Sequence, residues 1–435
     1  MTTTTMKTKI QTTSSTKVKT STGSRGTKFL ILFMRNYKPT GDLTIYITTD
    51  KETEVEIRSS QNLNANIKSS VDRTINIASS SMVTLPHDLT CGYMEIEPKG
   101  LILQTSELST VTIFDSLFHD TNDETLIIPT NKLSTKYIVS STEPWDTQWD
   151  FSQFAFGALY DETTVNVFFK MNDNSRVNLF GRTYGNGDVF SINLQRLETF
   201  QIRHTTDLSG TFITSTKGIP VFSGNRCQKL DSRAGCDHML TQLPPTNELD
   251  YQYIVPPFYN NARTLIQVIS ENMTFVKHST GNKLSRFRLN RKEFKNLTVA
   301  SNETTVLVSE KPILVTGFAM GSHTYDCYMT VIPGVNQFVD YYKITIPDGY
   351  KENFISVILP IKSTNYLRIN GITADNFTRV YQNYALLKTT FNIRTFEVQK
   401  GTYIVTTTDD SKFALIVYGH RSNDGYGFAG NFVLP

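Results

Sequence analysis

An internal repeat constrains the fold of this chain more than any other feature of its sequence. Three connecting stretches each carry a proline that is followed, eight residues later, by a tyrosine. The pairs are Pro129 and Tyr137, Pro245 and Tyr253, and Pro333 and Tyr341. Because proline fixes φ and ends the preceding turn, each crossing would deliver an aromatic side chain into the first strand of the next unit. The spacing therefore predicts similar units in tandem.

Short apolar runs predict that these units consist of β-strands. Runs such as residues 44–47, 165–169 and 354–359 are bounded by Gly, Asn, Asp or Pro, a spacing typical of sandwiches. The charged fraction is only 19%, and Thr, Ser, Asn, Tyr and Phe are abundant, which favours half-buried pleated surfaces over helices. We predict an all-β chain of tandem β-sandwich-like units with almost no helix; a β-propeller is the alternative.

The predicted boundaries follow from the repeat. Residues 1–27 have almost no apolar content and cannot offset the entropy of ordering, so we expect a disordered Thr, Ser and Lys-rich tail. The four β units that we predict cover residues 28–118, 119–235, 236–324 and 325–435. One helical turn is predicted at Asp237–Gln242, with Asp237 as its cap.

The charge and hydropathy patterns exclude several classes of partner. The net charge of +3 arises from a leading stretch with six basic and no acidic residues, which leaves 37 of the 43 basic residues against 40 acidic ones. We therefore expect no nucleic-acid binding. No apolar run is long enough to span a bilayer, and the first residues lack a signal-peptide core. A secreted chain would then be a fragment or carry a mispredicted start.

The four cysteines predict one disulfide and no metal site. Cys227 and Cys236 bracket a polar loop, and we expect them to be bonded; two separate thiols are the alternative. Cys91 and Cys327 could pair or stay reduced. His238 stands close to the cysteine loop, but the ligand spacing is unlike that of zinc sites. We expect neither a metal nor a small-molecule cofactor.

Both tryptophans lie in one short acidic stretch. We expect Trp145, Asp146, Trp149 and Asp150 to bind a ligand, because exposed indoles beside carboxylates suit a sugar or protein partner. An alternative is that the indoles fold back onto the sandwich. A glycan-active hydrolase that uses these acids with Glu143 is a further alternative, although two acids four residues apart in one loop rarely face each other across a bond.

Four sequons offer acceptors for N-glycosylation. They lie at Asn272, Asn296, Asn302 and Asn376. A chain this rich in Asn, Ser and Thr would contain about six such matches by chance, so the sequons alone carry little weight.

The middle of the chain resembles a known family. Residues 220–225, Cys227, Cys236-Asp237-His238, Gln242-Leu243-Pro244 and 253–256 are similar to the pattern "S-G … C … C-x-H … Q-L-x-P … Y-x-V-P" of the IgG Fc-binding protein amino-terminal domain family. The opening Gly26 to Phe29 with Asn36-Tyr37, and the closing Tyr418-Gly419-His420 with Tyr426-Gly427, fit the same family more weakly. The resemblance spans residues 26–435.

This resemblance implies an extracellular, non-catalytic binding or adhesion module of a mucus-type or matrix-type secreted protein. Its partners would be extracellular glycoproteins or mucins, bound through the loops of the sandwiches. Fc binding belongs to some members only and has no recognisable motif here, so it is not carried over. A structural spacer that binds nothing specific is the alternative of a different class.

Overall fold

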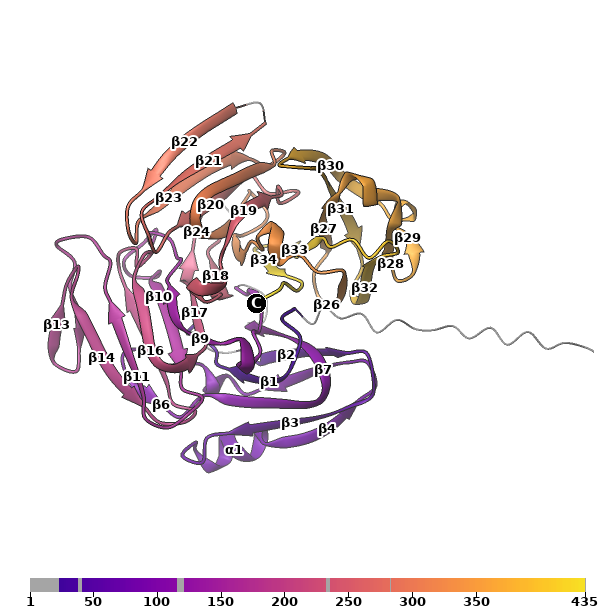
Figure 1. Cartoon of the computed structure of the whole chain (residues 1–435). Helices are drawn as coiled ribbons and strands as arrows, with labels where there is room; N and C mark the ends of the chain where they lie inside the picture. Colours follow the sequence, from indigo (N-terminus) through magenta and orange to yellow (C-terminus); the bar gives the residue numbers. More distant parts are fainter. Residues whose placement is uncertain (1–22, 38–40, 116–120, 232–234, 282, 435) are drawn as a thin grey trace, which may run out of the picture.

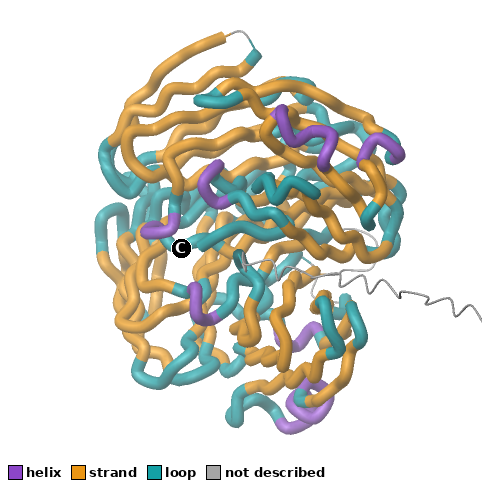
Figure 2. The backbone as a smooth tube through the Cα atoms, turned by 45° about the vertical axis from the view of Figure 1, so that its right-hand side comes forward, coloured by secondary structure: helices purple, strands orange, loops and turns teal. Residues whose placement is uncertain are grey.

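The computed structural model describes residues 23–37, 41–115, 121–231, 235–281 and 283–434. Strands make up most of this part, which confirms the all-β prediction, and Figure 2 shows only short helical segments among them. The helical segments are α1 (Ala65–Val71) and the 3-10 turns η1 (His87–Leu89), η2 (Thr130–Lys132), η3 (Thr246–Glu248), η4 (Val335–Gln337), η5 (Ile361–Tyr366) and η6 (Ala374–Asn376).

The predicted tail is only partly within the described residues. Residues 1–22 lie outside them. Residues 23–27 do not belong to a tail, because Ser24 is buried and its hydroxyl donates to Asn431 at 2.6 Å, and β1 begins at Gly26. The start of the described chain is thus bonded to its end.

One long strand organises the first unit. The strands of unit 1 are β1 (Gly26–Ile31), β2 (Leu43–Thr49), β3 (Thr53–Ser59), β4 (Arg73–Ile77), β5 (Ser80–Leu85), β7 (Leu101–Asp115) and β8 (Glu124–Leu126). The first half of β7 pairs with β1 and β3, and its second half pairs with β2 and β8. Apolar side chains of both halves, including Ile45, Ile57 and Leu103, form one core, so the halves are the two layers of a sandwich.

Units 2 and 3 repeat this arrangement. The main strands of unit 2 are β9 (Ser134–Ile138), β10 (Ser152–Gly157), β11 (Thr163–Phe168), β14 (Val189–Leu194), β15 (Thr199–His204), β16 (Phe212–Ile219), β17 (Val221–Gln228) and β18 (Asp237–Gln242), with a β12 (Val177–Leu179) and β13 (Arg182–Tyr184) hairpin and with β6 (Ile96–Glu97) paired to β15. Unit 3 comprises β19 (Asp250–Val255), β20 (Arg263–Ile269), β21 (Thr274–Thr280), β22 (Lys283–Leu289), β23 (Phe294–Ala300), β24 (Thr305–Met320) and β25 (Tyr328–Val331). Pro220 divides the long strand of unit 2 into β16 and β17, whereas β24 is continuous.

Unit 4 completes the series. It comprises β26 (Tyr341–Ile346), β27 (Glu352–Pro360), β28 (Leu367–Ile369), β29 (Ile372–Thr373), β30 (Arg379–Leu386), β31 (Thr390–Val398), β32 (Gly401–Thr407), β33 (Ala414–Arg421) and β34 (Asp424–Ala429). In units 1 and 3 the first strand pairs with the first half of the long strand, and the last strand pairs with its second half. In units 2 and 4 two strands take the place of these halves, β16 and β17 in unit 2 and β32 and β33 in unit 4. The boundaries proposed from the sequence fall just before β8, β18 and β25. Each of these strands pairs with a strand of the preceding unit, so it belongs to that unit and not to the next one.

The repeated tyrosines have one structural role. Eight residues after Pro129, Pro245 and Gly334, the chain places Tyr137, Tyr253 and Tyr342, each at most 1% exposed. The hydroxyl of Tyr137 accepts the N–H of Ser134 at 2.9 Å, and that of Tyr253 accepts the N–H of Asp250 at 2.9 Å. The third repeat is therefore one residue later than predicted: Tyr342 is buried and Tyr341 is not.

The helical turn predicted at Asp237–Gln242 is wrong. This segment is β18, which pairs with β17 from Phe222 to Gln228. Local capping chemistry favours a helix there, but sheet pairing outweighs it.

The last strands of the four units meet at the centre of the molecule. β8 adjoins β18, β18 adjoins β25, β25 adjoins β34, and β34 adjoins β8. Figure 1 shows the units arranged around this point, where the C-terminus also lies. We call these four strands the central ring.

A single buried carboxylate connects all four units at the central ring. Oδ1 of Asp123 accepts the N–H groups of Glu124 at 2.8 Å and Gly427 at 3.1 Å. Oδ2 accepts those of Leu240 at 3.0 Å and Met329 at 3.2 Å. Burial raises the pKa of Asp123 well above its usual value, although these four hydrogen bonds oppose the shift.

Candidate functional site

The two tryptophans lie on the loop between β9 and β10 of unit 2, and a buried aspartate anchors this loop. Asp150 is 0% exposed, and its Oδ1 accepts the backbone N–H of Cys227 at 3.1 Å. Its Oδ2 accepts the side-chain amide of Asn225 at 3.3 Å. Burial raises the pKa of Asp150 to about 6. Asp150 was predicted to contact a ligand, but it lies inside the protein and fixes the loop to β17.

The two indoles are partly exposed. Trp145 is 45% exposed, and its Nε1 donates to the carbonyl of Cys227 at 2.7 Å. The Lys229 ammonium lies 5.5 Å from the centroid of the same indole. Trp149 is 43% exposed and meets the ring of Tyr37 edge to face, with 5.9 Å between ring centroids. Each indole is thus held on one side and open on the other.

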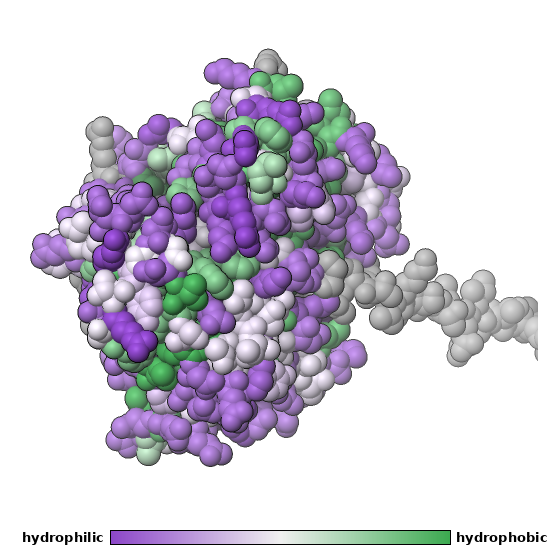
Figure 3. Space-filling model, turned by 60° about the vertical axis from the view of Figure 1, so that its left-hand side comes forward, coloured by the Kyte–Doolittle hydropathy of each residue, from purple (hydrophilic) through white to green (hydrophobic). Residues whose placement is uncertain are grey.

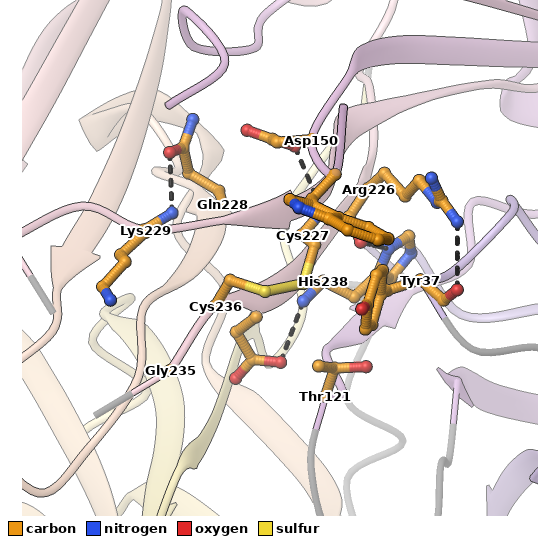
Figure 4. Close-up of a disulfide and its surroundings, with 12 residues drawn as sticks. Tyr37, Thr121, Asp150, Arg226, Cys227, Gln228, Lys229, Gly235, Cys236 and His238 are labelled. Atoms are coloured by element: carbon orange, nitrogen blue, oxygen red, sulfur yellow. Dashed lines mark hydrogen bonds between the residues drawn. A yellow bond between two sulfur atoms is a disulfide. The ribbon is translucent and has the colours of Figure 1, made fainter. Parts of the chain in front are cut away.

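The predicted disulfide is present next to this loop. Cys227 and Cys236 are bonded, with 5.0 Å between their Cα atoms, and the bond joins β17 to the residue before β18. Figure 4 shows Asp150 above the bond and Tyr37 to the right of it. Cys91 and Cys327 are free and buried, and burial raises the pKa of the Cys91 thiol to about 12.

Two cationic side chains lie near the exposed indoles, Lys229 against Trp145 and Arg226 against Tyr37. The guanidinium of Arg226 lies 5.3 Å from the ring centroid of Tyr37 and donates to the Tyr37 carbonyl at 3.1 Å. We call Tyr37, Trp145, Trp149, Arg226 and Lys229 the tryptophan face. Tyr37, Arg226 and Lys229 were not predicted from the sequence as parts of this site. Their signal was present, since Tyr37 belongs to the Asn-Tyr pair of the opening motif and Arg226 adjoins Cys227.

The carboxylates near the tryptophans have separate roles. Oδ1 of Asp146 accepts the N–H groups of Gln148 at 2.7 Å and Trp149 at 3.0 Å, so Asp146 shapes its own turn. Glu143 instead accepts the N–H of Asp207 at 2.8 Å. With Asp150 buried, the three acids do not form the open carboxylate pair that glycoside hydrolysis requires.

His238 is a buried structural residue beside the disulfide. Its Nδ1 lies 3.3 Å from the carbonyl of Arg226, and its Nε2 lies 3.4 Å from Asp115. Burial lowers the pKa of His238 to about 4 and raises that of Asp115 to about 7. The imidazole is therefore neutral near pH 7. Across the described ranges, no three His, Cys, Asp or Glu side chains are arranged to hold a metal ion.

The four sequon asparagines all lie at the surface. Asn272, Asn296, Asn302 and Asn376 are exposed. In the part of the chain that the structure describes, no helix has the length and apolarity that crossing a membrane requires.

The solved structures with some likeness to this chain are weak matches. A mutant of the major pilin of Streptococcus pyogenes has a TM-score of 0.15 and 6% identity, over 93% of this chain and 99% of that one. A Ca²⁺-stabilised ice-binding adhesin of an Antarctic bacterium has a TM-score of 0.12 and 8% identity, over 95% of this chain and 100% of that one. These scores carry no argument about fold.

The sequence comparisons are informative. The human protein named IgGFc-binding protein is 28% identical over 257 residues, which are 58% of this chain but only 5% of that protein. This chain thus spans a small fraction of that relative. The profile of the family described as IgGFc binding protein matches residues 123–419, about two thirds of the chain, including the disulfide and the loop of the two tryptophans. The chain belongs to the IgGFc-binding protein family.

Proposed function

We propose that this chain is an extracellular, non-catalytic binding module that recognises glycoproteins or other matrix proteins through the tryptophan face. The observation that carries the proposal is the pair of half-exposed indoles, Trp145 and Trp149, on a loop that Asp150 and the disulfide fix to the sandwich. Family membership supports a binding role.

The chemistry of the tryptophan face suits recognition. Indole, phenol and guanidinium groups are the side chains that contribute most at protein interfaces, and indoles also stack on sugar rings. Because Trp145 donates to a backbone carbonyl and Asp150 is buried, little side-chain freedom is lost when a partner binds. Arg226 and Lys229 would favour a partner with acidic groups beside its apolar or sugar surface.

An extracellular location fits two further observations. A disulfide persists in oxidising compartments. All four sequon asparagines are accessible to glycosylation. The human relative's name says that it binds the Fc part of IgG, so Fc is one of the glycoproteins to be tested.

The test is a binding assay with the full chain against purified mucin, IgG Fc and a glycan array. We expect the W145A/W149A double variant to bind its partner at least tenfold more weakly while its melting temperature stays close to that of the wild type. Tyr160→Ala is the matched control, because Tyr160 is an aromatic residue of unit 2 with 54% exposure and lies outside the tryptophan face.

Two outcomes would overturn the proposal. Equal binding by the wild type and the double variant would place recognition elsewhere. No binding to any of the three probes would favour a structural spacer. If a partner binds, its enzymatic deglycosylation distinguishes two modes of recognition. Binding through the sugar would be lost, and binding through the protein would remain.

A further inference from the structure

Unit 3 carries a basic segment that the overall charge balance conceals. Between Thr274 and Ala300 the sequence contains seven basic residues and one acidic residue, Glu293. The basic residues are Lys277, Lys283, Arg286, Arg288, Arg291, Lys292 and Lys295. They lie on β21, β22 and β23 and in the turn that precedes β23, so the fold gathers them on one unit.

Strand register places three of these cations on one face of the sheet. Lys277 is paired with Arg286, and Phe275 is paired with Arg288, so all four side chains share a face. The guanidinium of Arg286 lies 4.1 Å from the ring centroid of Phe275 and pairs with Glu310 at 2.9 Å. Among the described residues, Lys277 and Arg288 make no ion pair. This face therefore has an excess of positive charge.

The same face continues into a groove between units 3 and 4. Val306 and Val308 of β24 lie beside Lys277 and Ser279, and Leu386 and Leu387 approach from the β30 end of unit 4. The groove has a volume of about 370 Å³, and Lys388 also lines it. β24 contacts β30, and Figure 1 shows unit 3 and β30 next to each other at the top of the molecule.

Two side chains of this groove are unusually accessible. Leu284 is 78% exposed and Leu386 is 73% exposed, which makes them the most exposed large hydrophobic residues of the described chain. They come from edge strands of two different units and line the same groove. A contiguous apolar surface between basic side chains is typical of an interaction site and not of an ordinary solvated face.

We propose that this groove binds an extended acidic peptide segment in which apolar and acidic side chains alternate. In an extended peptide, alternate side chains point to opposite sides, so apolar groups can face Val306, Leu284 and Leu386. Lys277 and Lys388 line the same groove, and their long side chains can extend past the peptide backbone to carboxylates on its other side. The apolar floor favours a peptide over an anionic polysaccharide, which would present only polar groups. This surface lies apart from the tryptophan face and does not depend on it.

The test measures fluorescence anisotropy with the full chain and a labelled twelve-residue peptide of alternating Leu and Asp. We expect saturable binding. A peptide with Lys in place of Asp, and another with Ser in place of Leu, should each bind at least tenfold more weakly.

Variants of the groove locate the binding site. We expect L284S/L386S and K277E/K388E to weaken binding of the Leu/Asp peptide at least fivefold. All four side chains are exposed, so the melting temperature should stay close to that of the wild type. The matched control is M82S/K136E, which changes an exposed hydrophobic residue and an exposed cation of units 1 and 2.

Three results would overturn the proposal. The first is no saturable binding of the Leu/Asp peptide. The second is equal binding by the wild type and both groove variants. The third is heparin binding that K277E/K388E abolishes while L284S/L386S leaves it intact, with no difference among the three peptides; this would identify a polyanion site.

Discussion

The central ring and the tryptophan face use carboxylates in opposite ways. In the ring, Asp123 is fully buried and accepts backbone N–H groups from all four units. In the loop that carries the two tryptophans of the face, Asp146 is only half-buried and accepts two N–H groups of its own turn. The first pattern joins segments that are distant in sequence, and the second shapes one loop. The side chains of the tryptophan face can therefore change without disturbing the contacts that close the central ring.

The largest effect is expected from breaking the ring at Asp123. Asp123→Ala would leave four buried N–H groups of four strands without an acceptor, at a cost of about 4–8 kcal/mol. We expect little folded protein, measured by thermal denaturation and circular dichroism. Asp146→Ala is the control and should lower stability by less than about 1 kcal/mol. Similar losses for both variants would remove the distinction between the two regions.

The disulfide should have the next largest effect. The C227S/C236S variant loses a bond that closes a loop of sequence separation 9, and chain entropy predicts a loss of about 2.5 kcal/mol. A reducing agent should lower the melting temperature of the wild type and leave that of the variant unchanged. If the reducing agent has no effect on the wild type, the bond does not contribute to stability.

A smaller, pH-dependent effect is expected at Glu124 beside the ring. Burial raises the pKa of Glu124 to about 8 from 4.5, so the carboxyl stays protonated in the folded chain at neutral pH. Its contribution to stability is complete below pH 4.5 and is lost as pH rises to 8. Glu124→Gln does not titrate and should therefore melt several degrees above the wild type at pH 8, and at nearly the same temperature at pH 5.

The control for this prediction is Glu54→Gln, since Glu54 is exposed on β3. Asp115, whose pKa burial raises to about 7, titrates in the same range, so Glu124→Gln should remove only part of the wild-type pH dependence. A wild type that is more stable at pH 8 than at pH 5 would contradict the prediction.

The smallest effect on stability is expected at the tryptophan face. Trp145→Ala loses the hydrogen bond to Cys227 and the contact with the Lys229 ammonium, and Trp149→Ala loses one ring contact, with Tyr37. Because both indoles are partly exposed, each change should cost about 1 kcal/mol or less. A loss above about 3 kcal/mol in thermal denaturation would show that the indoles belong to the core.

Local signals in the sequence predicted much of the fold. The spacing from Pro129 to Tyr137 and from Pro245 to Tyr253 revealed the repeat, because the buried tyrosine is tied to a residue only three positions earlier. The same spacing was misleading at Pro333, where Gly334 is the residue that precedes the turn. The bond between Cys227 and Cys236 could also be predicted from the sequence, since the loop that it closes is short.

Features that depend on distant contacts could not be predicted in this way. Asp123 bonds to Leu240 and Gly427, which are more than a hundred and three hundred residues away. Asp150 was predicted at the surface because it adjoins Trp149 in a short acidic stretch, but its partners lie on β17. Segment 237–242 has the local chemistry of a helix and is a strand because β17 pairs with it.

The exposed surface also shows what an average over the sequence conceals. The side formed by unit 2 comes forward in Figure 3, where hydrophobic residues are interspersed among hydrophilic ones. On unit 3, the basic residues around Lys277 are balanced in the total charge by acids elsewhere, so only the strand register reveals them as one face.

The central claim is that the central ring joins the four units into one cooperatively folding unit, with the tryptophan face and the groove between units 3 and 4 on its surface. Differential scanning calorimetry of the full chain tests it most directly. The account predicts one transition whose calorimetric and van't Hoff enthalpies agree. A calorimetric enthalpy several times the van't Hoff value, or separate transitions for separate units, would contradict it.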